Sequence, residues 1–170
     1  MNELDYKQKL TNYIAARIPL SESDKDHINA CYTLVDVKKK HYLFEAGKPC
    51  THEGFVVEGS FRLYYIDFKG LEHVLYFAFE EWWVGDMASF YTGEPSGLNA
   101  QALEDSKILV IDPLKKEALF EAVPALERLF RIITQKHMAV LQKRFLLTVS
   151  ASASERYQEL IKRSPGIEQL

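Results

Sequence analysis

The chain has 170 residues, of which 47% are hydrophobic and 26% are charged. This size and composition are typical of a single soluble globular domain with a core of its own. The formal net charge of −3 argues against a chain that binds nucleic acid through overall electrostatic attraction.

Residues 3–31 are predicted to form two helices. Pro19 ends the first apolar run, and Ser21 followed by Asp24 is the pattern of a capping box. We therefore expect a second short helix that runs through Ile28 to Cys31. The apolar residues of the first helix recur at helical spacing: Leu4, Leu10, Tyr13, Ile14 and Ile18.

Residues 33–111 are predicted to form a β unit. Short runs rich in Val, Tyr, Phe and Leu are separated by Gly or Pro, which favours a barrel, sandwich or jelly roll over a parallel sheet. A glycine at position 70 marks the tip of one hairpin. The predicted strands are residues 34–37, 41–45, 54–58, 61–67, 73–79, 98–103 and 108–111.

Two further helices are expected after the strands. Asp112 followed by Pro113 is typical of an N-cap with proline in the first turn, and this helix should end near Val123. Pro124 then opens a longer helix over residues 124–148. A capping box at Ser152 and Glu155 predicts another helix from 156 to 161, which breaks at 164–166.

Apolar residues surround most of the long helix, so it must be buried on two sides. One side can cover the β unit, and a second copy of the chain is the simplest cover for the other. Leu126, Ile133, Val140 and Leu147 lie seven residues apart, as in a coiled-coil seam. A central helix in a monomer is the alternative. The predicted dimer interface is Leu126, Phe130, Ile133, His137, Val140, Leu141, Arg144 and Leu147.

The cysteine content and the lack of long apolar runs indicate in which cellular compartment we expect the protein. Cys31 and Cys50 lack the number and spacing of a disulfide scaffold or a zinc site, so we expect reduced thiols in a cytoplasmic protein. No apolar run approaches the ~20 residues of a membrane span, and the first residues lack the pattern of a signal peptide. We therefore expect no membrane partner.

The order of helices, β unit, short helix and long helix resembles the Crp/Fnr family of bacterial transcription regulators. The resemblance covers about residues 20–163 and is carried by an ordered set of motifs. These are Phe44-Glu45-Ala46-Gly47-Lys48, the strand–turn–strand pattern of residues 55–63, Val84-Gly85-Asp86, residues 102–111 and Val123-Pro124.

The resemblance implies an α+β fold: a jelly-roll-like β roll with N-terminal helices and a long C-terminal dimerisation helix. We expect N-terminal helices in residues 1–30, the cyclic-nucleotide-binding-like roll with its short helix in 31–122, and the dimerisation helix with a following helix in 123–170. It also implies a homodimeric sensor for a small-molecule effector. In that family a helix-turn-helix domain that binds DNA follows, and we expect it to be absent from this chain.

Gly85 and Asp86 match the start of the cassette that cradles a cyclic phosphate in this family. Family members that bind cyclic nucleotides continue with Gly-Glu, where Ser89 and Phe90 stand here, and with an Arg-Ser or Arg-Thr pair, where Ser96 and Gly97 stand. Arg62 is the one guanidinium that we expect could reach the site from a neighbouring strand. Leu141 and Gln142 match positions of the long helix that meet the base.

Between Gly70 and Ser106 the chain has seven acidic residues and no lysine or arginine. A phosphate site normally needs a guanidinium or several aimed backbone N–H groups. A charge-assisted hydrogen bond is worth about 1.5–3 kcal/mol, so its loss costs one to two powers of ten in affinity. We therefore expect no bound cyclic nucleotide and name no cofactor. The acids are Glu72, Glu80, Glu81, Asp86, Glu94, Glu104 and Asp105.

Other functions stay open at this point. The aromatic residues Phe77, Phe79, Trp82, Trp83, Phe90 and Tyr91 either fill the roll, which we favour, or line an apolar ligand pocket. A stand-alone cyclic-nucleotide-binding or interaction domain without DNA binding would share the fold. A cupin-type metalloenzyme would need clustered ligands, but His41, His52 with Glu53, and His73 are irregularly spaced, so we expect no metal and no enzyme. A haem-binding sensor of the same family is a further alternative, and a visible absorption spectrum would show whether haem is bound.

Overall fold

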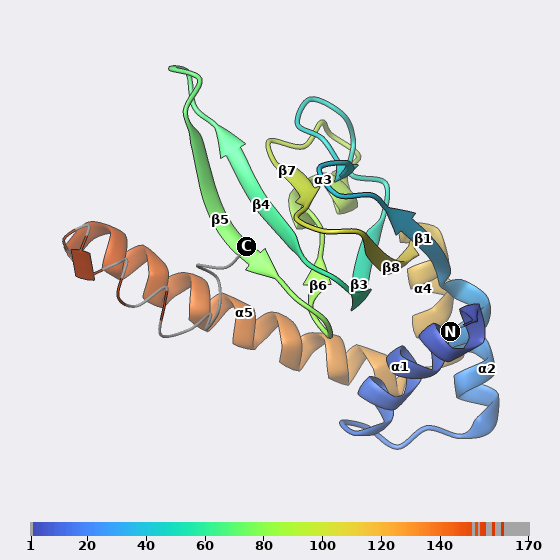
Figure 1. Cartoon of the computed structure of the whole chain (residues 1–170). Helices are drawn as coiled ribbons and strands as arrows, with labels where there is room; N and C mark the ends of the chain where they lie inside the picture. The colour runs from blue at the N-terminus through green and yellow to red at the C-terminus, as the bar shows by residue number, and fades with distance from the viewer. Residues whose placement is uncertain (1, 151, 153, 156–157, 159–160, 162–170) are drawn as a thin grey trace. The chain divides into compact units, whose positions relative to one another are not determined.

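The computed structural model of the chain describes residues 2–150, 152, 154, 155, 158 and 161. The chain divides into two compact units, Met1–Leu126 and Glu127–Leu170. Helices α1–α4 and the strands belong to the first unit, and α5 runs from the last residues of the first unit into the second (Figure 1).

The first unit begins with helices α1 (Glu3–Ala15) and α2 (Glu22–Cys31). The predicted capping box of Ser21 and Asp24 is confirmed at the start of α2. A second capping box, which the sequence analysis did not name, starts α1: the Asn2 side chain accepts from the Asp5 backbone, and the Asp5 carboxylate accepts from the Asn2 backbone. Both helices thus begin with satisfied backbone N–H groups and an acidic first turn.

The described strands form two four-stranded antiparallel sheets, with orders β1-β8-β3-β6 and β2-β7-β4-β5. The predicted α+β fold with a β roll is confirmed. One short strand, β6, was not predicted, because two residues between turns give no alternation to detect. The strands are β1 (Thr33–Val37), β2 (Tyr42–Phe44), β3 (Glu53–Glu58), β4 (Phe61–Ile66), β5 (Glu72–Ala78), β6 (Trp83–Val84), β7 (Asn99–Ala102) and β8 (Ser106–Ile111).

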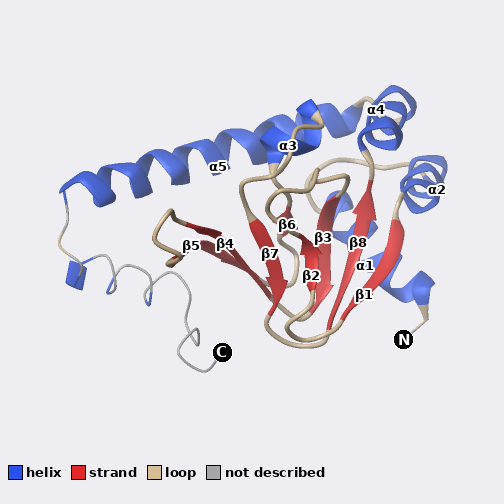
Figure 2. Ribbon diagram, turned by 90° about the horizontal axis from the view of Figure 1, so that it is seen from above, coloured by secondary structure: helices blue, strands red, loops and turns tan. Residues whose placement is uncertain are grey.

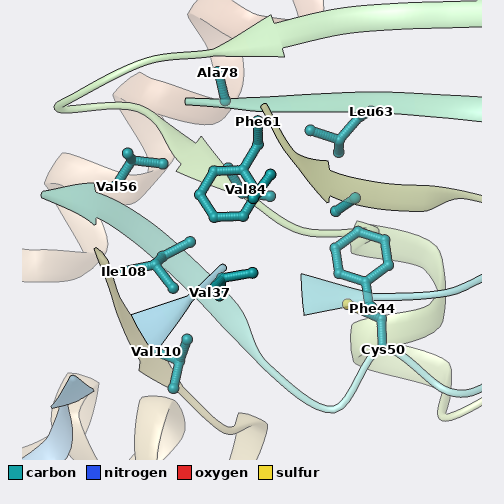
Figure 3. Close-up of a cluster of buried hydrophobic side chains, with 12 residues drawn as sticks. Val37, Phe44, Cys50, Val56, Phe61, Leu63, Ala78, Val84, Ile108 and Val110 are labelled. Carbon is teal, nitrogen blue, oxygen red and sulfur yellow. The ribbon is translucent and has the colours of Figure 1, made fainter. Parts of the chain in front are cut away.

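The two sheets bury an aliphatic core between them (Figure 3). Val56 and Ile108 come from one sheet and Phe61 and Leu63 from the other, and all four are fully buried. Side chains alternate between the faces of a strand, so Val56 of β3 and Phe61 and Leu63 of β4 enter this core while their neighbours Phe55 and Arg62 face away from it. The core is completed by Val37, Phe44, Cys50, Ala78, Val84, Ala100, Ala102 and Val110.

Gly59 makes the turn between β3 and β4 possible. Its φ is +88°, in the left-handed region that favours glycine, and a Cβ there would lie 2.3 Å from Ser106 Oγ and 2.9 Å from Ser106 Cα. The turn therefore passes directly over the start of β8, which lets the chain cross from one sheet to the other.

Helix α1 lies on the outer face of the β1-β8-β3-β6 sheet (Figure 2). A cluster of aromatic rings fills the space between the helix and the sheet. Phe55, which alternates with Val56, lies 4.9 Å from the Tyr13 ring and 5.1 Å from the Trp83 ring. Tyr32 contacts the other side of Trp83 at 6.3 Å. Aromatic packing thus fixes α1 and the end of α2 on this sheet.

Three helices follow strands β6 and β8. α3 (Met87–Thr92) was not predicted, whereas α4 (Pro113–Ala122) begins at Asp112 as expected. α5 (Ala125–Ser150) matches the predicted 124–148 within two residues. The Ser152–Glu155 capping box is present, and most of the helix predicted after it lies outside the described residues. In the part of the chain that is described, no helix is long and apolar enough to cross a bilayer.

Candidate functional site

The candidate site is the cassette segment, residues 85–98, which joins β6 to β7. Asp86 caps α3, because its Oδ1 accepts from the backbone N–H groups of Ala88 at 3.1 Å and Ser89 at 3.3 Å. Gly93 ends the helix with a positive φ of 74°. The motif that the resemblance singled out thus forms a capped turn of helix.

Ser96 completes the hydrogen bonding of Asp86. Its hydroxyl donates to Asp86 Oδ2 at 2.7 Å and accepts from the Leu98 backbone N–H at 3.0 Å. Ser96 is buried, and its backbone bonds to Gly47 and Lys48 across the neighbouring loop. Both carboxylate oxygens of Asp86 therefore have partners within the protein.

Ser89 fastens the cassette segment to the loop that precedes β3. The Cys50 backbone N–H donates to Ser89 Oγ at 2.8 Å, and Ser89 Oγ donates to the Glu94 carbonyl. Ser89 is buried, and Cys50 belongs to the core between the sheets, where burial raises the pKa of its thiol. Gly97, in contrast, is exposed with open space around it.

Tyr76 lies in β5 of the β2-β7-β4-β5 sheet, and its side chain reaches the start of the cassette segment, which follows β6 of the other sheet. It lies opposite Leu63 in β5 and packs against the core. Burial is the main cause that raises the pKa of Tyr76 above the ordinary tyrosine value. The charges of Glu53 and Asp86 add to the rise, and a hydrogen bond from the Gly85 backbone opposes it. The phenol thus ends beside the Gly-Asp motif.

The structure does not bring Arg62 to the cassette segment. Its neighbours in β4, Phe61 and Leu63, enter the core, so Arg62 lies on the outer face of its sheet. There its guanidinium pairs with Glu72 at 2.7 Å and donates to Gln101 at 2.9 Å.

Phe90 stands where the resemblance places the glutamate of the cassette, but its ring packs inside the protein beside a lysine. It is buried in α3, and its ring centroid lies 5.4 Å from the Nζ of Lys116. Lys116 in α4 forms an ion pair with Glu53 in β3, and both side chains are buried. Lys116 was not predicted to lie at the site, because a lysine in the first turns of a helix is usually exposed.

Leu141 and Gln142, the predicted contacts to a base, are exposed residues of α5 in the second unit. Among the predicted interface residues, Leu126 is buried in the first unit. His137, Val140 and Leu141 are exposed, and Phe130, Ile133, Arg144 and Leu147 are half-buried. The pocket and dimer roles of these residues stay predictions.

The aromatic residues of the acidic stretch do not gather at one place. Trp83 and Phe90 are buried, but neither belongs to the core between the sheets. Trp82 and Tyr91 are exposed. Phe77 lies opposite Arg62 in β5, and Phe79 makes an edge contact with Trp82.

The residues considered as metal ligands are also dispersed. His52 contacts Thr51, His73 pairs with Asp67, and Glu53 pairs with Lys116. Within the described residues, no group of three or more His, Cys, Asp or Glu side chains could hold a metal ion.

A separate groove of about 370 Å³ lies between α1 and β3. Its lining includes two basic residues, Lys9 and Arg17, and two acidic residues, Glu80 and Glu81. Lys9 is already bonded to the Val57 carbonyl at 2.7 Å and lies 3.7 Å from Glu80. None of the residues predicted for the ligand site lines this groove.

The two antiparallel sheets with a capped helix between β6 and β7 define a jelly-roll-like β roll. Residues 34–122 match the family model described as the cyclic nucleotide-binding domain, and the chain belongs to that family. No curated protein matches the sequence.

Solved structures of transcription regulators share the fold. The catabolite activator protein of Thermus thermophilus is 19% identical with a TM-score of 0.64; the match covers 76% of this chain and 61% of that protein. The sensor domain of the regulator DNR from Pseudomonas aeruginosa is 19% identical with a TM-score of 0.60, over 89% of this chain and 95% of that domain. The N-terminal domain of a Streptomyces coelicolor transcriptional regulator is 19% identical with a TM-score of 0.59, over 76% and 91%.

Proposed function

We propose that this chain is the effector-sensing and dimerisation part of a Crp/Fnr-like transcription regulator and that its effector is not cyclic AMP. The match to a cyclic nucleotide-binding domain and the folds of three regulator structures support the sensor role. The chain spans 61% of the Thermus activator, so DNA binding would come from a domain beyond the matched part.

The observation that carries the exclusion of cyclic AMP is the Ser96–Asp86 hydrogen bond. The resemblance assigns the phosphate arginine to the position of Ser96, and here a hydroxyl holds the Asp86 carboxylate instead. An anionic phosphate beside Asp86 would meet negative charge without a guanidinium, at a cost of about 1.5–3 kcal/mol for the lost charge-assisted bond.

The environment of Tyr76 supports an effector that carries no negative charge. Its phenol lies beside Gly85 and near the carboxylates of Glu53 and Asp86. A molecule that entered the roll here would meet an apolar wall, one hydroxyl and the carboxylate of Asp86, since the charge of Glu53 is balanced by Lys116. This setting favours a largely apolar compound without negative charge.

Dimerisation through α5 is supported by the apolar side chains that its C-terminal half exposes. A homodimer would bury them, and an effector that prefers one arrangement of paired helices would shift the population toward it. Attached DNA-binding domains would follow the helices. The exposed residues are Met138, Val140, Leu141, Phe145, Leu146 and Val149.

Calorimetry and light scattering test these two parts separately. Titration of cyclic AMP into the purified chain should give no binding heat at micromolar concentrations, and micromolar affinity would overturn the assignment of the cassette segment. Light scattering should report a dimer, and a monomer at high concentration would remove the dimerisation role. A Ser96→Arg variant that gained affinity for cyclic AMP would identify the missing charge as the cause.

A further inference from the structure

A buried ion pair joins two elements of the first unit, β3 and α4. Glu53 opens β3 and Lys116 lies in the second turn of α4, and their side chains are only 6% and 2% exposed. β3 pairs with β8 so that Glu53 lies opposite Ile111, and β8 runs directly into α4 through Asp112. The sheet register thus brings Lys116 over Glu53.

The cassette segment lies against both members of the pair, through Gly85 at Glu53 and through α3 at Lys116. A Cβ on Gly85 would lie 3.5 Å from Glu53 Cγ, so the start of the segment packs on the acid. On the other side, the ammonium of Lys116 lies 5.4 Å from the Phe90 ring centroid and 5.7 Å from that of Tyr91. A third ring, Phe120 of α4, lies at 5.8 Å. These distances are within the range of cation–π attraction.

The strength of this pair depends on the position of α3. Two charges attract strongly only where water is excluded, and the rings of Phe90 and Tyr91 cover the ammonium. If α3 moved, the cation would lose two aromatic contacts, and water would reach a pair that is held by a dry environment. A buried ion pair is also often no more stabilising than an apolar pair of similar volume, so packing alone does not account for it.

Helix α4 connects this cluster to α5. α4 ends at Ala122, and α5 begins at Ala125 after Val123 and Pro124. A linker of two residues is therefore the only stretch of chain between α4 and the start of α5.

We propose that the Glu53–Lys116 pair, with its cover of Phe90 and Tyr91, is a latch that couples the cassette helix α3 to α4. With α3 in place the pair is dry and α4 is held on the end of β3. An effector that displaces α3 hydrates the pair and releases α4. The latch gives the proposed sensor its internal coupling, and its regulatory meaning rests on that proposed function.

Hydrogen exchange of the full chain without any effector tests the latch. Phe90→Leu keeps an apolar side chain in α3 but removes the π face that contacts Lys116. We expect α4 amides (Pro113–Ala122) to exchange about three- to tenfold faster, although the substitution lies in α3. Phe44→Leu is the matched control: it removes a buried ring from the core between the sheets and should not raise exchange selectively in α4.

If Phe90→Leu fails to fold, three other variants still test whether α3 and α4 are coupled through this pair. Tyr91→Leu alters an exposed ring of the same cover and should act in the same direction with a smaller effect. Lys116→Met should speed exchange in both α3 and α4, whereas Lys115→Met, at a side chain that is 53% exposed, should leave both unchanged.

Two results would overturn the latch. Faster exchange confined to α3 in Phe90→Leu would show that the helices are not coupled, and the same pattern in Phe44→Leu would show only a general loss of stability. These outcomes are independent of the sensor proposal, because no ligand is used. Conversely, micromolar binding of cyclic AMP would overturn that proposal and leave the exchange pattern intact.

Discussion

Apolar side chains are buried in the β roll but exposed on the C-terminal half of α5. In the roll, Phe61 and Leu63 are fully enclosed between two sheets, and the polar groups of the cassette segment satisfy one another. In α5, Leu141 is 56% and Phe145 is 69% exposed. The roll therefore has the features of a complete folding unit, whereas this half of the helix carries apolar surface that the single chain leaves in water.

Buried and exposed apolar residues therefore have different consequences, the first for folding and the second for association. Burial in the roll specifies a fold, and a ligand must work against contacts that are already made. Exposure of apolar residues on α5 underlies the proposed association, because the free energy of burying them is realised only when a second surface covers them. A sensor needs both, since a stable frame must transmit a change to a surface whose partner can shift.

Alanine substitutions in the two regions should give the largest contrast. Phe61→Ala removes a fully buried ring and should lower the free energy of unfolding by about 3–5 kcal/mol. Leu141→Ala, at an exposed position, should change it by less than about 0.5 kcal/mol in dilute protein. Urea denaturation followed by circular dichroism measures both. Equal losses would show that α5 and the roll share one core.

Charged substitutions on α5 should affect association and not folding. Leu141→Asp with Phe145→Asp places two carboxylates on the apolar surface, where each buried side chain would contribute about 1.5–3 kcal/mol to a dimer. We expect the dissociation constant to rise at least roughly a hundredfold by light scattering. Leu114→Asp, at an exposed apolar residue of α4, is the control and should leave it unchanged. A dimer that survives the double substitution would place the interface elsewhere.

Alanine substitutions at two glycines should separate the cost of a steric clash from the cost of backbone strain. Gly59 and Gly70 have similar positive φ values of 88° and 81°, but only Gly59 has atoms within 4 Å of the position of a Cβ. Gly59→Ala should therefore cost about 2–4 kcal/mol, and Gly70→Ala about 1 kcal/mol from backbone strain alone. Thermal unfolding of the two variants separates the clash from the strain. Equal costs would mean that Ser106 yields to the added methyl group.

Local sequence patterns predicted much of this fold. Alternating apolar runs placed most strands within about two residues, and Ser21 and Asp112 marked two helix starts. These features depend on neighbours in the chain, which the sequence displays directly. The short β6 and α3 were missed because two to six residues contain too little periodicity to detect.

The candidate site was predicted less well, because it depends on residues far apart in the chain. Glu53 and Lys116 are 63 positions apart, and only the pairing of β3 with β8 brings them together. Arg62 was expected to be able to reach the site, yet alternation in β4 directs it to the outer face, where Glu72 holds it. The missing charge at Ser96 was visible in the sequence, but its bond to Asp86 was not.

The smallest expected effect lies at the tip of the β4–β5 hairpin, where the roll is least enclosed. His73 pairs with Asp67 at 2.8 Å and is the main cause that lowers the pKa of Asp67 below its ordinary value of 3.8; the backbone N–H groups of Leu71 and Lys69 assist. A carboxylate with a lowered pKa stabilises the fold fully above its unfolded value, and this contribution declines as the pH falls below about 3.8. Urea denaturation of the wild type should therefore show a steeper loss of stability below that pH than Asp67→Asn. Because both side chains are partly exposed, the difference should be small and should shrink in high salt, and identical pH profiles would show that the pair contributes nothing.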